Sequence, residues 1–176
     1  TTTFQPCQLS NGLAAQECRK CNGIWVASLH YFAWLRQQNK PFPDQAPGAE
    51  TLPAWDTDQA KICPDCGHLL TRYKIWPNIE FFLDHCGSCN GIWFDRNEWQ
   101  AVETHNLHDD LNQVFSKPWQ RKLKESEARQ VLEKVYAERF GSDDYARIQE
   151  VRAWIQAHPQ SAMLLAYLYA KDPYQF

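Results

Sequence analysis

Two stretches, Cys63-Pro-Asp-Cys66 and Cys86-Gly-Ser-Cys89, place four cysteines in two Cys-x-x-Cys pairs with 19 residues between the pairs. This spacing falls within the Cys-x2-Cys-x15–20-Cys-x2-Cys window of zinc sites. Two residues between cysteines allow a tight turn that directs both sulfur atoms toward one point, and Gly67 and Gly87 are expected to ease these turns. Four thiolates leave no open coordination position, so the spacing predicts a structural zinc site rather than a hydrolytic one.

Other interpretations of these cysteines stay open at this point. The first turn is also compatible with rubredoxin-like iron, and free buried cysteines or a thioredoxin-type redox pair are further alternatives. Six of the seven cysteines stand in Cys-x-x-Cys pairs, and an odd number fits poorly with a secreted disulfide protein. We therefore expect metal ligation in a reducing compartment and a cytoplasmic location.

A β-hairpin is expected to join the two cysteine pairs. Leu69–Ile75 and Ile79–Asp84 are rich in β-branched and aromatic residues, and Pro77-Asn78 between them is typical of a turn. Asp95 stands three residues before Glu98, which predicts a capping-box start for a short helix over 96–104.

The second cysteine pair belongs to an internal repeat. Cys18-Arg-Lys-Cys21-Asn-Gly-Ile-Trp25 matches Cys86-Gly-Ser-Cys89-Asn-Gly-Ile-Trp93 at six of eight positions. An aromatic-rich stretch over 28–37 follows the first copy and is also expected to be a helix. The chain is therefore predicted to contain two copies of one small module.

The first copy has one further cysteine upstream, Cys7, where the second copy has two. Structural zinc is nearly always four-coordinate, so Cys7, Cys18 and Cys21 need a fourth ligand. We predict a second zinc site in which His30 is that ligand, with Ser10, a carboxylate or water as alternatives. A metal-free relic of the repeat is the competing interpretation.

Proline density marks the boundary between the copies, with Pro41, Pro43, Pro47 and Pro53 in a segment read as a linker. The fold class is predicted to be α+β, built from small zinc-stabilised modules: two zinc-ribbon β-hairpin modules, the first degenerate, plus a C-terminal helical unit. The predicted parts are a first module over 1–38, a linker over 39–60, a second ribbon over 61–105 and a helical region over 106–176.

The helical region is expected to form three helices. Apolar residues recur with helical spacing from Pro118 to Phe140 and again over 143–157. The last segment, 160–170, is apolar nearly all round, which predicts that it is buried.

Composition argues against some partners. The chain is 44% hydrophobic and 22% charged with a net charge of −3, so it has no overall attraction for nucleic acid or an anionic membrane. It contains no apolar run long enough to span a membrane. The stretch 116–140 is locally basic, and the candidate nucleic-acid-binding residues within it are Lys117, Trp119, Arg121, Lys122 and Lys124.

The second copy resembles the transcription factor IIB-type zinc-ribbon family of bacterial proteins. The family pattern is Cys-Pro-x-Cys, a hairpin, then Cys-x-x-Cys-x-Gly-x-Trp-hydrophobic-Asp-x-x-Glu, and residues 61–104 follow it throughout. The resemblance implies that the four cysteines are zinc ligands and suggests a link to transcription. The first copy departs from the pattern, because Val26-Ala27 replaces the hydrophobic-Asp step and His30 stands at the position of Glu98.

We find no phosphate-binding loop, nucleophile elbow or paired carboxylates with catalytic spacing, so an enzyme is not expected. The sequence favours a non-enzymatic zinc-binding protein that acts as a protein-interaction module, without a small-molecule substrate. The alternative is a nucleic-acid-binding zinc ribbon whose binding is weak. A rubredoxin-like iron electron carrier is the third hypothesis.

Overall fold

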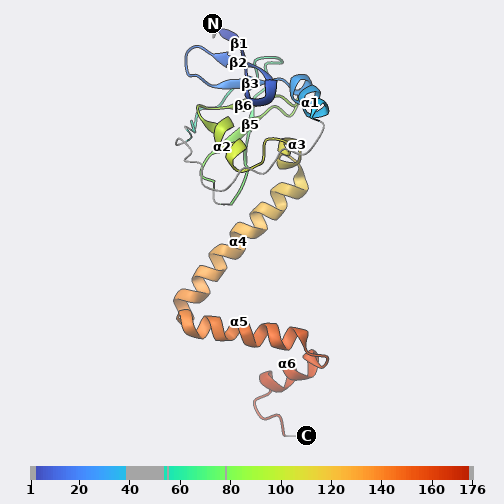
Figure 1. Ribbon diagram of the computed structural model, residues 1–176. Helices are drawn as coiled ribbons and strands as arrows, with labels where there is room; N and C mark the ends of the chain where they lie inside the picture. Colours follow the sequence, from blue (N-terminus) through green and yellow to red (C-terminus); the bar gives the residue numbers. More distant parts are fainter. Residues whose placement is uncertain (1–2, 39–53, 55, 78, 175–176) are drawn as a thin grey trace. The chain divides into compact units, whose positions relative to one another are not determined.

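The computed structural model describes residues 3–38, 54, 56–77 and 79–174. The chain divides into two compact units, Thr1–Glu125 and Ser126–Phe176 (Figure 1). Most of the predicted linker, residues 39–53 and 55, lies outside the described residues. The predicted α+β class is confirmed.

One antiparallel sheet contains both copies of the repeat. Its strands are β1 (Phe4–Gln8), β2 (Ala14–Cys18), β3 (Ile24–Val26), β4 (Thr71–Lys74), β5 (Phe82–His85) and β6 (Ile92–Phe94), in the order β1-β2-β3-β6-β5-β4. Each copy contributes three consecutive strands, and β3 pairs with β6 at the centre so that Trp25 stands opposite Trp93. The two copies are therefore halves of one sheet rather than separate modules.

The helices follow the predicted order along the chain. They are α1 (Ser28–Gln37), α2 (Glu98–Thr104), α3 (Leu111–Val114), α4 (Lys117–Phe140), α5 (Ser142–Ala157) and α6 (Ser161–Tyr169). In each copy the third strand is followed directly by a helix, α1 or α2, as the repeat predicts. A 3-10 turn over Ser10–Gly12 connects β1 to β2.

Two tryptophan–glycine contacts hold the halves of the sheet together. The ring of Trp25 packs on Gly91 of the other copy, and the ring of Trp93 packs on Gly23. A Cβ atom at either glycine would lie 2.2 Å from the facing indole ring, which is far inside van der Waals contact. The repeated Asn-Gly-Ile-Trp is thus an interlock, because the tryptophan of each copy requires the glycine of the other.

The first unit extends well beyond the second ribbon. The Tyr31 hydroxyl donates to the carbonyl of His108 at 3.0 Å and accepts from the N–H of Leu111 at 3.1 Å. At the start of α4, the indole N–H of Trp119 donates to the carbonyl of Ile75 at 3.3 Å. Residues 106–125 therefore belong with the ribbons, and the unit boundary falls after Glu125 rather than at the predicted position 106.

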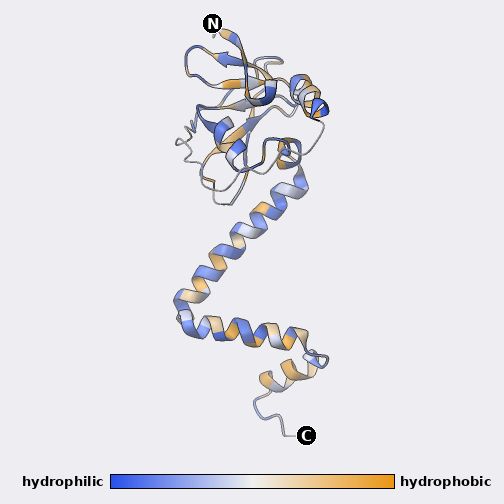
Figure 2. Ribbon diagram, viewed as in Figure 1, coloured by the Kyte–Doolittle hydropathy of each residue, from blue (hydrophilic) through white to orange (hydrophobic). Residues whose placement is uncertain are grey.

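The second unit has almost no interior of its own. Within residues 126–174, Ile155 is the only buried side chain. Met163 and Leu168 on α6 are 67% and 62% exposed, so the predicted burial of segment 160–170 is wrong for the described unit. Figure 2 shows that α6 is largely hydrophobic, and most of its large apolar side chains are exposed in the described unit.

The interlock predicts a specific sensitivity to a single methyl group. Gly91→Ala should lower the free energy of unfolding by about 1–3 kcal/mol, the usual cost of overpacking, because the added Cβ collides with Trp25. Gly87→Ala is the matched control, since nothing lies within 4 Å of a Cβ at that position. Urea unfolding of the zinc-loaded protein measures both, and equal stability of the two variants would contradict the interlock.

Candidate metal centre

The first cysteine turn is built by backbone hydrogen bonds around Cys63. Its N–H donates to the carbonyl of His68 at 2.8 Å, and its carbonyl accepts from the N–H of Gly67 at 3.0 Å. Gly67 has φ +72, a left-handed conformation that favours glycine, as expected from the sequence. The turn brings the sulfur atoms of Cys63 and Cys66 to the same side.

The second turn has the same hydrogen bonds. The N–H of Cys86 donates to the carbonyl of Gly91 at 2.9 Å, and its carbonyl accepts from the N–H of Asn90 at 2.8 Å. The left-handed residue here is Asn90, with φ 57. The role expected for Gly87 in easing this turn is therefore taken by Asn90, a residue type that tolerates this conformation.

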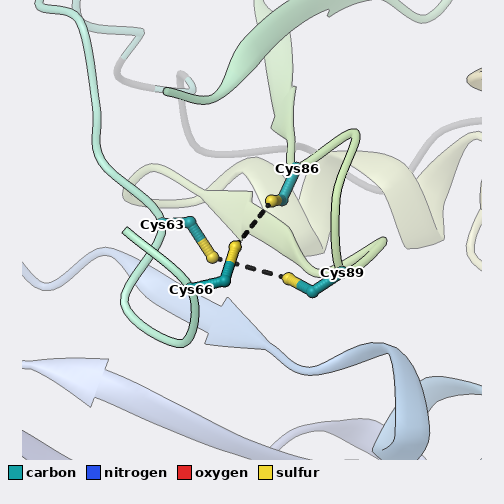
Figure 3. A group of neighbouring side chains, drawn as sticks. All are labelled: Cys63, Cys66, Cys86 and Cys89. Atoms are coloured by element: carbon teal, nitrogen blue, oxygen red, sulfur yellow. Dashed lines mark hydrogen bonds between the residues drawn. The ribbon is translucent and has the colours of Figure 1, made fainter. Parts of the chain in front are cut away.

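The four sulfur atoms converge on one point (Figure 3). The Sγ atoms of Cys63 and Cys89 are 3.5 Å apart, those of Cys66 and Cys86 are 3.4 Å apart, and all four lie within 4.8 Å of one another. A tetrahedron of thiolates with zinc–sulfur bonds of about 2.3 Å has sulfur–sulfur edges of about 3.8 Å. The donor set and its spacing fit a zinc ion, so these cysteines form the predicted zinc site.

The electrostatics of the cluster favour a bound cation. Hydrogen bonds from the backbone N–H of His68 and from its imidazole, 3.3 Å from the sulfur, lower the pKa of the Cys66 thiol to about 6. Burial raises the pKa of Cys63 and raises that of Cys89 to about 12. Four closely spaced sulfurs cannot all ionise without a compensating charge, and a dication supplies it.

The first copy contributes directly to the surroundings of this site. Trp25 and Cys18 lie in the same buried cluster as Cys63 and Cys86. The indole N–H of Trp25 donates to the carboxylate of Asp65, within the first cysteine turn, at 3.0 Å. A residue of the degenerate copy thus orients the turn that carries two zinc ligands of the other copy.

The first copy also forms its own cysteine turn. The N–H of Cys18 donates to the carbonyl of Gly23 at 2.8 Å, and its carbonyl accepts from the N–H of Asn22 at 2.9 Å. Asn22 has φ 59, like Asn90 in the second copy. Cys18 and Cys21 therefore have the backbone geometry of a ligand pair.

The structure does not bring the predicted first site together. β1 pairs with β2 so that Phe4 stands opposite Cys18. Cys7 is three residues from Phe4, so its side chain lies on the other face of the sheet from Cys18, where it packs against the main core. His30 is exposed on α1. Among the described residues, Cys7 and His30 join no group of metal-ligating side chains with Cys18 and Cys21.

The register of the sheet explains why Cys7 is no counterpart of a ligand. In the second copy Thr71 pairs with His85, so Leu70 stands opposite Cys86 in the way that Phe4 stands opposite Cys18. Cys7, three residues after Phe4, therefore corresponds to Tyr73 of the second copy and not to Cys63 or Cys66.

The candidate nucleic-acid-binding residues lie at the start of α4. Trp119 is partly buried and packs against the core and against Trp76, with ring centroids 5.9 Å apart. Its indole N–H donates to the carbonyl of Ile75, so the ring is anchored to the first unit. The basic side chains of the set are exposed: Lys117, Arg121, Lys122 and Lys124.

The structure also contains a largely buried acidic cluster that no pattern in the sequence predicts. Carboxylate oxygens of Asp56, Asp95 and Glu98 lie within 4.8 Å of one another. Only the capping role of Asp95 and Glu98 was predicted, and one Glu98 oxygen does accept from the N–H of Asp95 at 2.7 Å. Asp56 fell within the predicted linker, and no local pattern in the sequence places it beside them.

Comparison with known proteins agrees with the geometry. Residues 62–103 match the family model described as transcription factor zinc-finger, the TFIIB-type zinc ribbon. This segment spans the four clustered cysteines and the following helix α2, so the second copy is a zinc ribbon of this type. Searches of curated proteins and of solved structures return no match to the chain. Among the described residues, no helix has the length and apolar character needed to cross a bilayer.

The geometry predicts one tightly bound zinc per chain. Cys63→Ser and Cys89→Ser should each lose the metal and unfold the ribbon, because such sites contribute on the order of 10–16 kcal/mol to folding. Cys7→Ser and His30→Ala should leave the zinc content unchanged, since neither side chain joins the cluster. Metal analysis of the purified protein measures the ratio. A red, iron-containing protein, or zinc content that falls with Cys7→Ser, would contradict this assignment.

Proposed function

We propose that this is a non-enzymatic zinc-binding protein that acts as a protein-interaction module. Residues 1–125 form a zinc-stabilised scaffold, and the helices of residues 126–176 provide the binding surface. The observation that carries this proposal is the exposure of large apolar side chains along the second unit, since contiguous exposed apolar surface is typical of interaction sites.

The exposed apolar residues are spread over all three helices of this unit. Trp154 is 56% exposed and Tyr169 is 95% exposed, while the unit buries a single side chain. A 51-residue unit with so little interior gains most of its stabilisation when another surface covers these side chains. The remaining members of the set are Val131, Leu132, Tyr136, Phe140, Ile148, Val151, Met163, Leu165, Tyr167, Leu168 and Tyr174.

A groove of about 500 Å³ runs between α5 and α6. Its lining is mostly apolar and carries two arginines: Ile148, Val151, Ile155, Leu165, Gln156, Arg147 and Arg152. A hydrophobic floor with basic side chains suits an amphipathic protein segment that has acidic residues beside its apolar face. We therefore assign the partner as a protein that offers such an acidic amphipathic segment.

Other features agree with this assignment. The unit itself is close to neutral, with seven acidic and six basic residues over 126–176, which gives no electrostatic attraction for nucleic acid. None of the seven cysteines forms a disulfide, which suits a reducing compartment such as the cytoplasm. The family name of the ribbon supports a role connected with transcription, at the level of an analogy.

The groove predicts which substitutions weaken partner binding. The double variant Val151→Glu/Leu165→Glu should lose at least about tenfold in partner capture, a change of about 1.4 kcal/mol, because it places carboxylates against an apolar and acidic segment. Both residues are about half exposed in the free chain, so the helices should persist. Capture by the tagged full chain from extracts of its native cell, quantified by mass spectrometry, measures the effect.

Leu29→Glu is the matched control, since Leu29 is 72% exposed on α1 in the other unit. It should retain the same partners as the wild-type chain. Arg147→Glu/Arg152→Glu should weaken capture of the same proteins, and raised salt should act in the same direction. A set of captured proteins that is identical for wild type and groove variant would exclude this surface.

The second candidate function is nucleic-acid binding through the exposed basic residues of α4. Four basic side chains neutralise few phosphates, so we expect only weak, salt-sensitive binding to duplex or single-stranded oligonucleotides. Fluorescence titration at physiological salt measures it. Sub-micromolar affinity that is lost in Lys122→Ala/Lys124→Ala, but kept in the exposed-site control Lys171→Ala, would favour this function over protein binding.

A further inference from the structure

A buried acidic cluster joins the segment 56–61 to the start of α2, outside the zinc site. Asp56 comes from that segment, Asp95 follows β6 and Glu98 begins α2. Glu98 is only 1% exposed, and carboxylate oxygens of all three residues lie within 4.8 Å of one another. So short a separation between largely buried carboxylates requires a positive charge or a proton.

Two cations compensate part of this negative charge. Lys61 forms ion pairs with Asp84 at 2.6 Å and with Asp95 at 3.0 Å. Arg72 forms ion pairs with Asp56 and with the fully exposed Asp58. If the carboxylates of Asp56, Asp84, Asp95 and Glu98 were all ionised, these four charges against two cations would leave a net −2 in a largely buried site.

Some carboxylate oxygens of the cluster have hydrogen-bond partners and others have none among the described residues. One oxygen of Asp95 accepts from the indole of Trp93 at 2.7 Å, and the other accepts from Thr57 and Lys61. One oxygen of Asp56 accepts from Arg72, and one oxygen of Glu98 accepts from the N–H of Asp95. The remaining oxygens, Oδ1 of Asp56 and Oε1 of Glu98, are buried without a hydrogen-bond partner in the described structure.

We propose that Glu98 is a proton-binding site, whose bound proton forms a hydrogen bond from Oε1 of Glu98 to Oδ1 of Asp56. One proton satisfies both free oxygens and halves the excess negative charge. A divalent cation fits less well, because both oxygens of Asp95 are already occupied and the Lys61 ammonium stands where the cation would be repelled. This hydrogen bond between Glu98 and Asp56, called the latch below, links segment 56–61 to α2.

The surroundings of Glu98 mainly favour its protonated form. Burial, together with the neighbouring Asp95 and Asp56, raises the pKa of Glu98 to about 9, against the opposing effects of the Asp95 N–H and Lys61. A pKa that is higher in the folded than in the unfolded chain gives stabilisation that is complete below the unfolded pKa. That stabilisation decreases as the pH rises and is lost once the pH passes the folded pKa. The latch is therefore closed at neutral pH and opens in alkaline solution.

The test follows the Glu98 carboxyl group by carbon-13 NMR in the full-length, zinc-loaded protein. Its resonance is assigned by its absence from Glu98→Gln, in which an amide reproduces the donor of the protonated acid. We expect the wild-type resonance to remain that of an acid at pH 7 and to titrate near pH 9. In Asp56→Asn the amide supplies a donor to Glu98, so the midpoint should fall by at least about one pH unit.

Stability measurements give a second, independent readout. Between pH 6 and about 9, the thermal midpoint of wild type should decrease relative to that of Glu98→Gln, because in this range unfolding of the wild type releases the Glu98 proton. Three outcomes would overturn the proposal. The first is a pH midpoint of wild-type Glu98 near the ordinary value of about 4.3. The second is a Glu98 carboxyl resonance that shifts at neutral pH when Mg²⁺, Ca²⁺ or excess Zn²⁺ is added. The third is a Glu98 titration midpoint in Asp56→Asn that equals that of wild type.

Discussion

The structure of residues 1–125 depends on the contact between four sulfur atoms. Cys63 and Cys66 come from one turn and Cys86 and Cys89 from another, and the closest sulfurs of the two turns are 3.4–3.5 Å apart. Thiolates at this separation repel one another unless a cation lies between them, so zinc fixes the distance between the turns. That distance in turn sets the position of β6, the strand through which the second copy pairs with the first.

The exchange of tryptophans extends this constraint to the degenerate copy. Trp25 fills the space over Gly91 and also donates to Asp65 in the ligand-bearing turn, while Trp93 fills the space over Gly23. The first copy thus keeps the residues that complete its neighbour. Its cysteine turn, with Cys18 buried beside Trp25, serves the packing of the shared sheet.

Features that depend on residues close together in the sequence could be predicted from it. The cysteine spacing predicted the zinc cluster, and the repeated Asn-Gly-Ile-Trp predicted two copies with helices in the same places. Three features depend on contacts between distant residues and could not be predicted in this way. The side of the sheet on which Cys7 lies follows from the β1–β2 register. The exposure of α6 follows from the absence of a covering layer in its described unit. The position of Asp56 beside Asp95 and Glu98 follows from the path of the segment before Lys61.

One zinc ion is expected to stabilise both copies through the shared sheet. Amide hydrogen exchange of the full chain, compared between the zinc-loaded and the chelator-treated protein, tests it most directly. We expect removal of zinc to abolish protection in β1–β3 as well as in β4–β6, while exchange in α5 and α6 stays unchanged. Loss of protection confined to residues 61–105, with β1–β3 still protected, would show that the first copy folds independently of the metal and would contradict the account.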